Sequence, residues 1–351
     1  MSSPLPASAS AHGEQRVTWA ELFFDLVWVF AITQIAIALA AAHGPGEAVA
    51  ALLLLVPLWW GWVGTTVFGN VAGTSLERTR GRLVLFTVAG CGLVMAVAIP
   101  AAYGRLGLLF VGSYVALRLL LWAAMRWRRN AGDGRAEVLP ASQLASLPLF
   151  VAGAFAPGGW RLALWALAGL AEVLTPILRK PPLGTTRVET SHLPERFGLF
   201  IIVAFGETVV AVGGQAATQV DAGRIATLAL CFVVIVALWW SYFHFSASAV
   251  RHSLEHDPEQ ARIVRDVFSY AHFLYVIAII GVAVGLKKLL AHPLDSAHSL
   301  PELLLAPGVG LYLLGFCYAR WRMFGAAALP RLFTSLACFA LTPAALVLPL
   351  V

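Results

Sequence analysis

Residues 19–42 read WAELFFDLVWVFAITQIAIALAAA, an apolar run interrupted by Glu21, Asp25, Thr33 and Gln34. About 20 consecutive apolar residues are enough for a helix to cross the hydrocarbon core of a bilayer. The run is longer than the apolar part of a usual signal peptide and contains two carboxylates. Small residues at its end, at 40–42, leave a cleaved signal peptide as the weaker alternative. We therefore predict an uncleaved membrane-spanning helix.

Comparable runs fill the rest of the chain. Of its 351 residues, 60% are hydrophobic and 12% are charged, and the mean hydropathy is +0.81. Soluble domains carry about 25% charged residues, so this composition excludes a soluble protein, and also a disordered or disulfide-stapled one. Because the runs are long and lack two-residue alternation, they predict helices and not strands. We expect an all-α polytopic membrane protein with eleven spans, at 19–42, 47–68, 82–103, 105–127, 138–157, 160–178, 195–217, 223–246, 265–290, 299–319 and 329–350.

The distribution of Lys and Arg predicts how these spans are oriented. The N-terminus and the loops after even-numbered spans hold eighteen of the 24 basic residues, Arg196 and Arg265 among them, and the other loops hold five. Cytoplasmic loops carry such an excess, so we expect the N-terminus in the cytoplasm, with residues 1–15 as a disordered tail. The net charge of +6 then reflects topology and attraction to anionic lipid. The expected partner is the lipid bilayer, and no nucleic acid is needed to explain the charge.

Three pairs of short motifs, in the same order along the chain, predict an internal duplication. The pairs are Leu58-Trp59-Trp60 with Leu238-Trp239-Trp240, Arg126-Trp127-Arg128 with Arg320-Trp321-Arg322, and Glu21-x-Phe23 with Glu195-x-Phe197. Halves of six spans would share one orientation, as in transporters built from parallel repeats. The expected halves are residues 16–178 and, with five helices, 195–351, joined by a cytoplasmic linker at 179–194. A twelfth helix would then be missing from this chain, unless its family has eleven.

The first run also carries Glu21-Leu22-Phe23-Phe24-Asp25-Leu26-Val27-Trp28-Val29-Phe30-Ala31, which resembles the opening ELFFDLVFVFA of the bacterial low temperature requirement A (LtrA) family. Trp28 stands where the family has Phe. Residues 195–208 resemble the family pattern ERFG…GE(S/T), and residues 265–272 resemble R-D-x-[YF]-S-Y-x-H. The positions that carry the resemblance are Glu21, Phe24, Asp25, Glu195, Arg196, Phe197, Gly198, Gly206, Glu207, Arg265, Asp266, Ser269, Tyr270 and His272.

This resemblance covers nearly the whole chain and implies a multi-pass protein of the bacterial cytoplasmic (inner) membrane. The family name comes from a growth phenotype in the cold and implies no substrate. The loose grouping of the family with transporter-like and receptor-like bundles is an analogy of fold, and fold does not fix function.

Ionisable side chains inside the predicted spans are the candidate functional residues, because they are costly in a bilayer unless they face a partner or water. Glu21 and Asp25 lie four residues apart on one helix face, where two like charges favour a bound proton or cation. For Glu21 a helix cap is the alternative, since Thr18-x-x-Glu21 is a capping box. Glu207 is expected near the midplane, either in a substrate or proton site or in a buried pair with an arginine.

Two further positions complete the candidates. Arg118 lies wholly within a span and requires a carboxylate, for which Glu207 and Glu172 are the available partners. A structural pair and an anion-binding role both stay open. His272 is either a proton relay or a hydrogen-bonded core residue. We expect no metal or cofactor, because the paired histidines at 252 and 256 and the four scattered cysteines have a simpler interpretation, as solvated loop and packing residues.

Several function classes lack their motif in this chain. P-loop, hydrolase, metalloprotease and potassium-filter motifs are absent from the sequence, and we do not expect an enzyme. The leading hypothesis is a secondary transporter of an unknown small solute or ion, with proton coupling as one option. Asp25 and Glu207 would carry the proton or cation, and Arg118 would balance charge. A channel or receptor-like sensor is the alternative, and a membrane-embedded enzyme comes last. The deciding observation is whether Asp25, Glu207, Arg118 and His272 converge on one water-accessible cavity.

Overall fold

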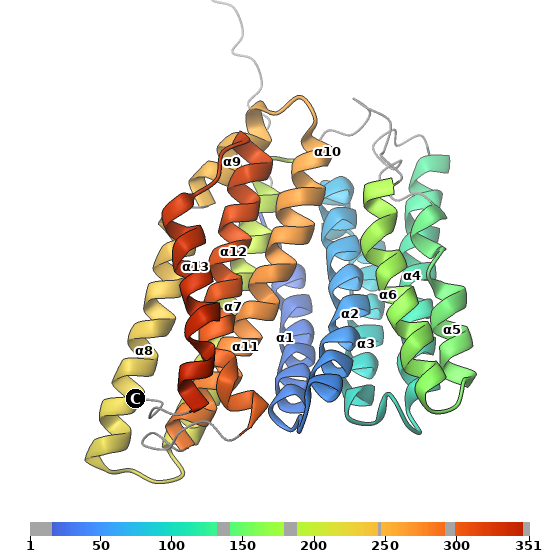
Figure 1. The fold of residues 1–351 in the computed structure, drawn as a ribbon. Helices are drawn as coiled ribbons and strands as arrows, with labels where there is room; N and C mark the ends of the chain where they lie inside the picture. Colours follow the sequence, from blue (N-terminus) through green and yellow to red (C-terminus); the bar gives the residue numbers. More distant parts are fainter. Residues whose placement is uncertain (1–15, 132–140, 179–187, 245–246, 292–298, 347–351) are drawn as a thin grey trace, which may run out of the picture.

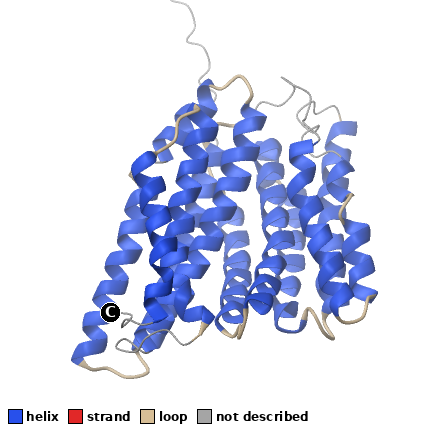
Figure 2. Ribbon diagram, viewed as in Figure 1, coloured by secondary structure: helices blue, strands red, loops and turns tan. Residues whose placement is uncertain are grey.

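The computed structural model describes residues 16–131, 141–178, 188–244, 247–291 and 299–346. Within these residues the chain forms helices, turns and loops and no strand (Figure 2). The helices pack into one bundle in which the chain passes from α4, α5 and α6 on one side to α8, α12 and α13 on the other (Figure 1). The long helices are α1 (Trp19–Ala40), α2 (Pro45–Ala72), α3 (Thr79–Ala98), α4 (Gly107–Asn130), α6 (Gly159–Leu178), α7 (His192–Ala216), α8 (Ala222–Phe243), α11 (His272–Ala291) and α12 (Leu305–Phe324).

Shorter elements join or extend these helices. The α-helices among them are α5 (Leu147–Phe155), α9 (Ala247–His256), α10 (Gln260–Ile263) and α13 (Leu329–Leu341). A π-helix, η5 (Val264–Ala271), connects α10 to α11 without a break, so that Gln260–Ala291 forms one long span. The 3-10 turns are η1 (Gly73–Glu77), η2 (Ile99–Ala101), η4 (Ala141–Leu144), η6 (Leu300–Leu304) and η7 (Thr342–Leu346).

Nine helices of the described chain are long and apolar enough to cross a membrane. They confirm the prediction of a polytopic helical membrane protein. The two other predicted spans are shorter, because α5 has 9 residues and α13 has 13. Proline explains both: Pro148 lies in the first turn of α5, and Pro343 follows α13, where its missing N–H ends regular helix. The parts of these two predicted spans at 138–140 and 347–350 lie outside the described residues.

Residues 247–256 were predicted to be a loop, and this prediction is wrong. They form α9, whose buried residues Val250 and Leu254 lie four positions apart and therefore share one helix face. His252 and His256 lie on the exposed face, with ring centroids 4.1 Å apart. The amphipathic spacing stabilises a helix lying against the bundle.

Two long helices begin earlier than predicted. Helix α7 starts at His192 and not at 195, and the ninth span starts at Gln260 and not at 265. Arg196 and Arg265 were counted with the adjoining cytoplasmic loops although they lie inside the predicted spans 195–217 and 265–290, and both are helical residues. Arg196 is fully buried.

The two expected halves meet through few helices. Helix α1 contacts α7 and α11, and α2 contacts α7. We call the α1, α2 and α7 contact the inter-half seam. Neighbours repeat within the halves, since α1, α3, α4 and α5 contact in the same order as α7, α11, α12 and α13. The duplication itself stays a prediction, which a superposition of the halves would test.

Candidate functional site

The start of α1 places Glu21 in the inter-half seam. Thr18 caps the helix: the Glu21 N–H donates to Thr18 Oγ1 (3.3 Å), and the Thr18 N–H donates to Glu21 Oε2 (2.9 Å). The predicted capping box is therefore confirmed. The other carboxylate oxygen, Oε1, lies 3.1 Å from Nε2 of His192 on α7, and both side chains are buried. Glu21 thus caps its own helix and binds the opposite half of the protein.

Asn70, near the end of α2, holds His192 in place. Its amide exchanges two hydrogen bonds of 3.1 Å with the backbone of Glu189, directly before α7. Asn70 Nδ2 also lies 3.4 Å from His192 Nδ1. If Nδ1 accepts from this amide, Nε2 carries the ring proton and donates it to Glu21. Gly69 leaves room for this contact, because a Cβ at that position would lie 2.8 Å from Glu21 Oε1.

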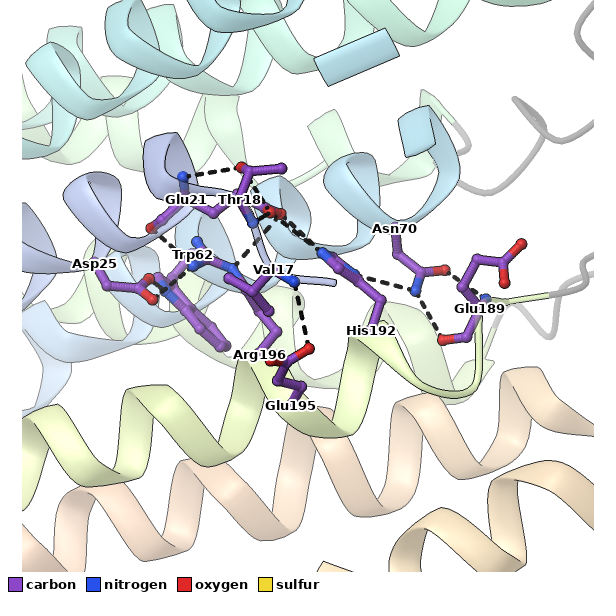
Figure 3. Close-up of polar contacts among 10 residues, drawn as sticks. All are labelled: Val17, Thr18, Glu21, Asp25, Trp62, Asn70, Glu189, His192, Glu195 and Arg196. Carbon is purple, nitrogen blue, oxygen red and sulfur yellow. Dashed lines mark hydrogen bonds and ion pairs between the residues drawn. The ribbon is translucent and has the colours of Figure 1, made fainter. Parts of the chain in front are cut away.

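One turn further along α1, Asp25 forms a buried ion pair across the same seam (Figure 3). Nη1 of Arg196 donates to Asp25 Oδ2 (2.6 Å) and to the backbone oxygen of Glu21 (2.7 Å). Trp62 Nε1 on α2 donates to Asp25 Oδ1 (2.8 Å). The guanidinium carbon also lies 5.6 Å from the ring centroid of Phe24 and 5.8 Å from that of Trp62. Arg196 is therefore held between two aromatic faces while it binds the carboxylate.

The charges of this network do not balance. Two carboxylates, Glu21 and Asp25, face one permanent cation, Arg196, and His192 is a neutral ring unless it gains a proton. Nε of Arg196 lies 3.9 Å from Glu21 Oε1 and has no hydrogen-bond partner among the described residues. A single proton, on His192 or on a carboxyl group, would neutralise the cluster. With a neutral His192 the network thus carries one negative charge in excess.

A second cluster occupies the π-helix η5. Asp266 accepts from Arg265 (2.6 Å to Nε) and from Arg322 of α12 (2.8 Å to Nε). Ser269 Oγ and His272 Nδ1 each contact a carbonyl five residues earlier, at 3.1 and 2.9 Å. These contacts follow the wider π-helical turn.

Three hydrogen bonds connect the π-helix η5 to the first half of the protein. The carbonyl of Ser269 accepts from Trp59 Nε1 on α2 (2.8 Å), and the Tyr270 hydroxyl donates to the Val173 carbonyl on α6 (2.6 Å). Nη1 of Arg265 lies 3.5 Å from the carbonyl of Pro176. The three contacts fix η5 between α2 and α6.

His272 has the geometry of a hydrogen-bonded core residue. Its Nδ1 contacts the Val267 carbonyl, so Nδ1 carries the proton, and Nε2 accepts from the Tyr242 hydroxyl at 2.7 Å. The ring is buried against Phe197 and Phe268. Of the two interpretations, the structure favours the core residue.

Arg118 pairs with Glu172, one of its two predicted partners. Nη2 of Arg118 on α4 lies 3.1 Å from Glu172 Oε2 on α6, and both side chains are buried. Arg118 also donates to the carbonyl of Gln143, and Glu172 Oε1 accepts from Tyr114 (2.6 Å) and from Ser146. The network joins α4, α6 and the start of α5, and it satisfies both charged groups.

Glu207 lies apart from Arg118. It is half-buried on α7, close to the hydroxyl of Thr33 on α1 and within electrostatic reach of Lys287 on α11. A Cβ at the preceding Gly206 would meet open space. Glu207 therefore faces the α1–α7 contact, nearer the other end of the bundle than Arg196.

The four residues whose convergence was named as the deciding observation do not meet at one point. Asp25 lies in the inter-half seam, Glu207 lies further along the same α1–α7 contact, Arg118 lies between α4 and α6, and His272 contacts α8. His192, Asn70 and Trp62 were not among the candidate residues, and Arg196 was predicted only as a position that carries the family resemblance, at the start of the span 195–217. Asn70 lies two residues beyond the predicted span 47–68, and it entered the site because α2 extends to Ala72.

Comparison with known proteins identifies the family. The family described as Bacterial low temperature requirement A protein (LtrA) matches residues 16–351. The chain belongs to the LtrA family. An uncharacterised protein of Rhizobium meliloti (strain 1021) is 32% identical over 294 residues, which cover 80% of this chain and 71% of that protein. No solved structure matches. In this LtrA protein, two of the three signature segments meet through the Asp25–Arg196 pair, and the third forms the π-helix.

Proposed function

We propose that this multi-pass LtrA protein is a secondary transporter of a small solute or ion in the bacterial inner membrane, coupled to protons at the inter-half seam. The observation that carries the proposal is the buried network of Glu21, Asp25, His192 and Arg196, which joins helices of both halves. Ionisable groups in membrane-spanning helices are functional candidates by default.

The position of the network supports this role better than a purely structural one does. A buried ion pair is weak evidence for stability, because the desolvation of both charges offsets their attraction. In transporters made of two repeats, access alternates as one half moves against the other. Protonation of Asp25 weakens its attraction to Arg196 and thereby loosens α1 from α7. Binding of a proton would thus weaken the α1–α7 contact, which has to rearrange during alternating access.

Glu207 provides a second ionisable group on the same path. It lies eleven residues after Arg196 on α7, about 16 Å along the helix axis at 1.5 Å per residue. The pair of positions would allow a proton to bind at two depths of one seam. Arg118 has no part in this proposal, since its guanidinium is held by Glu172 and by the carbonyl of Gln143.

Proteoliposomes test the proposal while the substrate is still unidentified. The full chain is reconstituted with a pH-sensitive dye inside, and pools of amino acids, sugars, nucleosides, carboxylates and inorganic ions are added outside. We expect one pool to drive proton movement into the lumen. Asp25→Asn and Glu207→Gln should each abolish it, and Glu47→Gln, at an exposed carboxylate of α2, should not.

Two results would overturn the proposal. The first is proton movement that follows an imposed voltage equally with and without added solute, which is the behaviour of a channel. The second is the absence of solute-driven proton movement for every pool, in protein shown by size exclusion to be folded. Solute-driven flux that persists in Glu207→Gln would remove Glu207 alone from the mechanism.

A further inference from the structure

A groove between α3 and α4 lies outside the seam and carries its own chemistry. At the arginine-rich end of the bundle, a cavity of about 830 Å³ opens between the end of α2, the start of α3 and the end of α4. Its apolar wall includes Phe68, Val84 and Leu120, and its rim includes Arg78 and Arg80. The cavity combines an apolar interior with cations at its mouth.

The two rim arginines lack an anionic partner. Neither guanidinium forms a hydrogen bond or ion pair with the described residues, although Glu77 is adjacent in the sequence. The guanidinium carbon of Arg80 lies 5.9 Å from the ring centroid of Trp127, a side chain that is 57% exposed. Tryptophan is enriched at the membrane–water interface, so we expect Arg80 at head-group depth.

Ser75 of the η1 turn lines the cavity. Arg128 donates to Ser75 Oγ and lies 3.5 Å from the carbonyl of Val71, which ties α4 to the end of α2. Gly81 allows η1 to lie against α3, because a Cβ there would be 2.4 Å from the carbonyl oxygen of Ser75. The backbone that carries Arg78 and Arg80 at the rim is therefore positioned by contacts of the fold.

A second, shallow depression of about 540 Å³ lies along the same two helices, further from the arginine-rich end. The first cavity reaches Val84 on α3 and Leu120 on α4. The second begins about one helical turn further from the arginine-rich end, at Thr87 on α3 and at Ala116 on α4. Gly90 and Gly112 form part of it, and a Cβ at either position would meet open space. From Gly81 to Cys91 the groove follows α3 for about 15 Å, which is half of a hydrocarbon core of about 30 Å.

We propose that the α3–α4 groove binds one anionic phospholipid of the leaflet at the arginine-rich end. Arg78 and Arg80 bind its phosphate, and one acyl chain follows the groove over Gly90 and Gly112. A guanidinium binds phosphate through charge-assisted hydrogen bonds. Charge complementarity selects an anionic head group, because a zwitterionic head group carries an ammonium that the two arginines would repel. The apolar groove, one leaflet deep, favours a lipid over a soluble phosphate.

Native mass spectrometry of the full chain in detergent tests the site. The probes are phosphatidylglycerol and phosphatidylcholine with identical acyl chains, and inorganic phosphate as the soluble competitor. We expect one phosphatidylglycerol to bind at least tenfold more tightly than phosphatidylcholine, and excess phosphate not to displace it. The double variant Arg78→Ala/Arg80→Ala should weaken its binding about 10- to 30-fold, since a basic residue near an anionic surface contributes about 1 kcal/mol.

Two variants separate a defined site from diffuse charge. Arg82→Ala/Arg126→Ala removes the same charge from exposed arginines of α3 and α4 that do not line the cavity, and it should change binding less than about twofold. Gly112→Leu fills the groove without changing charge and should weaken phosphatidylglycerol binding. Equal binding of the two lipids, equal losses in the two arginine variants, or displacement by phosphate would each overturn the proposal.

Discussion

The guanidinium of Arg196 on α7 lies 2.6 Å from the carboxylate of Asp25 on α1, although the two residues are 171 positions apart. Both side chains are about 1% exposed. The pair joins the two expected halves at the depth where Trp62 of α2 closes over Asp25. It is the contact on which the proposed transport mechanism depends.

Removing one partner of this pair should destabilise the protein strongly. Arg196→Leu leaves Asp25 buried without its cation, a change that costs about 3–5 kcal/mol in comparable buried pairs. Asp25→Asn/Arg196→Leu removes both charges, keeps an acceptor for Trp62, and should recover at least half of that loss. The midpoint of thermal unfolding in detergent, followed by tryptophan fluorescence, measures the effect. Arg224→Leu, at a partly exposed pair, is the control and should cost less than about 1 kcal/mol. An Arg196→Leu midpoint equal to that of the control would contradict this account.

Gly69 should be required for the contact between Glu21 and His192. In Gly69→Ala the new methyl group would lie 2.8 Å from Glu21 Oε1, so the carboxylate must move away from the histidine. We expect a destabilisation of about 1–3 kcal/mol, typical of overpacking, in the same thermal assay. Gly90→Ala, where the methyl group meets open space, is the matched control and should unfold within a degree or two of wild type. Equal midpoints for the two variants would show that the Glu21 carboxylate is free to shift.

Trp28 and Gly92 should behave as a coupled pair. A Cβ at Gly92 would lie 2.6 Å from the far edge of the Trp28 ring, and Nε1 of Trp28 has no partner among the described residues. Gly92→Ala should therefore destabilise, and Trp28→Phe, which removes that edge and the unpaired N–H, should rescue it. We expect a coupling energy of about 1–3 kcal/mol from the double-mutant cycle. If the effects of the two substitutions on the free energy of unfolding were additive, the predicted contact between position 92 and the Trp28 ring would be contradicted.

The hydrogen bond from Trp59 to the Ser269 carbonyl should protect the π-helix. Trp59→Phe removes the donor, and a buried carbonyl left without a partner costs about 1–3 kcal/mol. Hydrogen exchange of the η5 amides should accelerate, as measured by mass spectrometry. Trp239→Phe, at a ring that is 40% exposed on α8, should leave η5 protection unchanged. If η5 exchanges at the same rate in both variants, Trp59 does not restrain it.

Cysteine labelling tests the predicted orientation. His43, in the turn between α1 and α2, is expected outside the cell, and Arg129, at the end of α4, is expected in the cytoplasm. In a background where the native cysteines are alanine, His43→Cys should react with a membrane-impermeant maleimide in whole cells. Arg129→Cys should react only after the cells have been permeabilised. The reverse labelling pattern would show that the orientation in the membrane is opposite to the predicted one.

Much of the fold followed from local sequence properties. Hydropathy and charge spacing predicted the long helices and the capping box at Thr18 and Glu21, because both depend on residues a few positions apart. Chemistry alone limited the partner of Arg118 to two carboxylates, and the structure selected Glu172. The lengths of α5 and α13 were overestimated because hydropathy averages over Pro148 and Pro343, whereas a proline is tolerated in the first turn of a helix and not in its interior.

The candidate site was only half visible in the sequence. The sequence by itself determined that Glu21, Asp25 and Arg196 were exceptional, through the signature segments and the cost of charge in a bilayer. Tertiary structure decided that α1 and α7 lie together, so that the Asp25 carboxylate meets the Arg196 guanidinium and Asn70 fixes His192 against Glu21. The physical reason is that burial can be estimated from neighbouring residues, whereas the identity of a partner depends on which helices pack together and at what rotation.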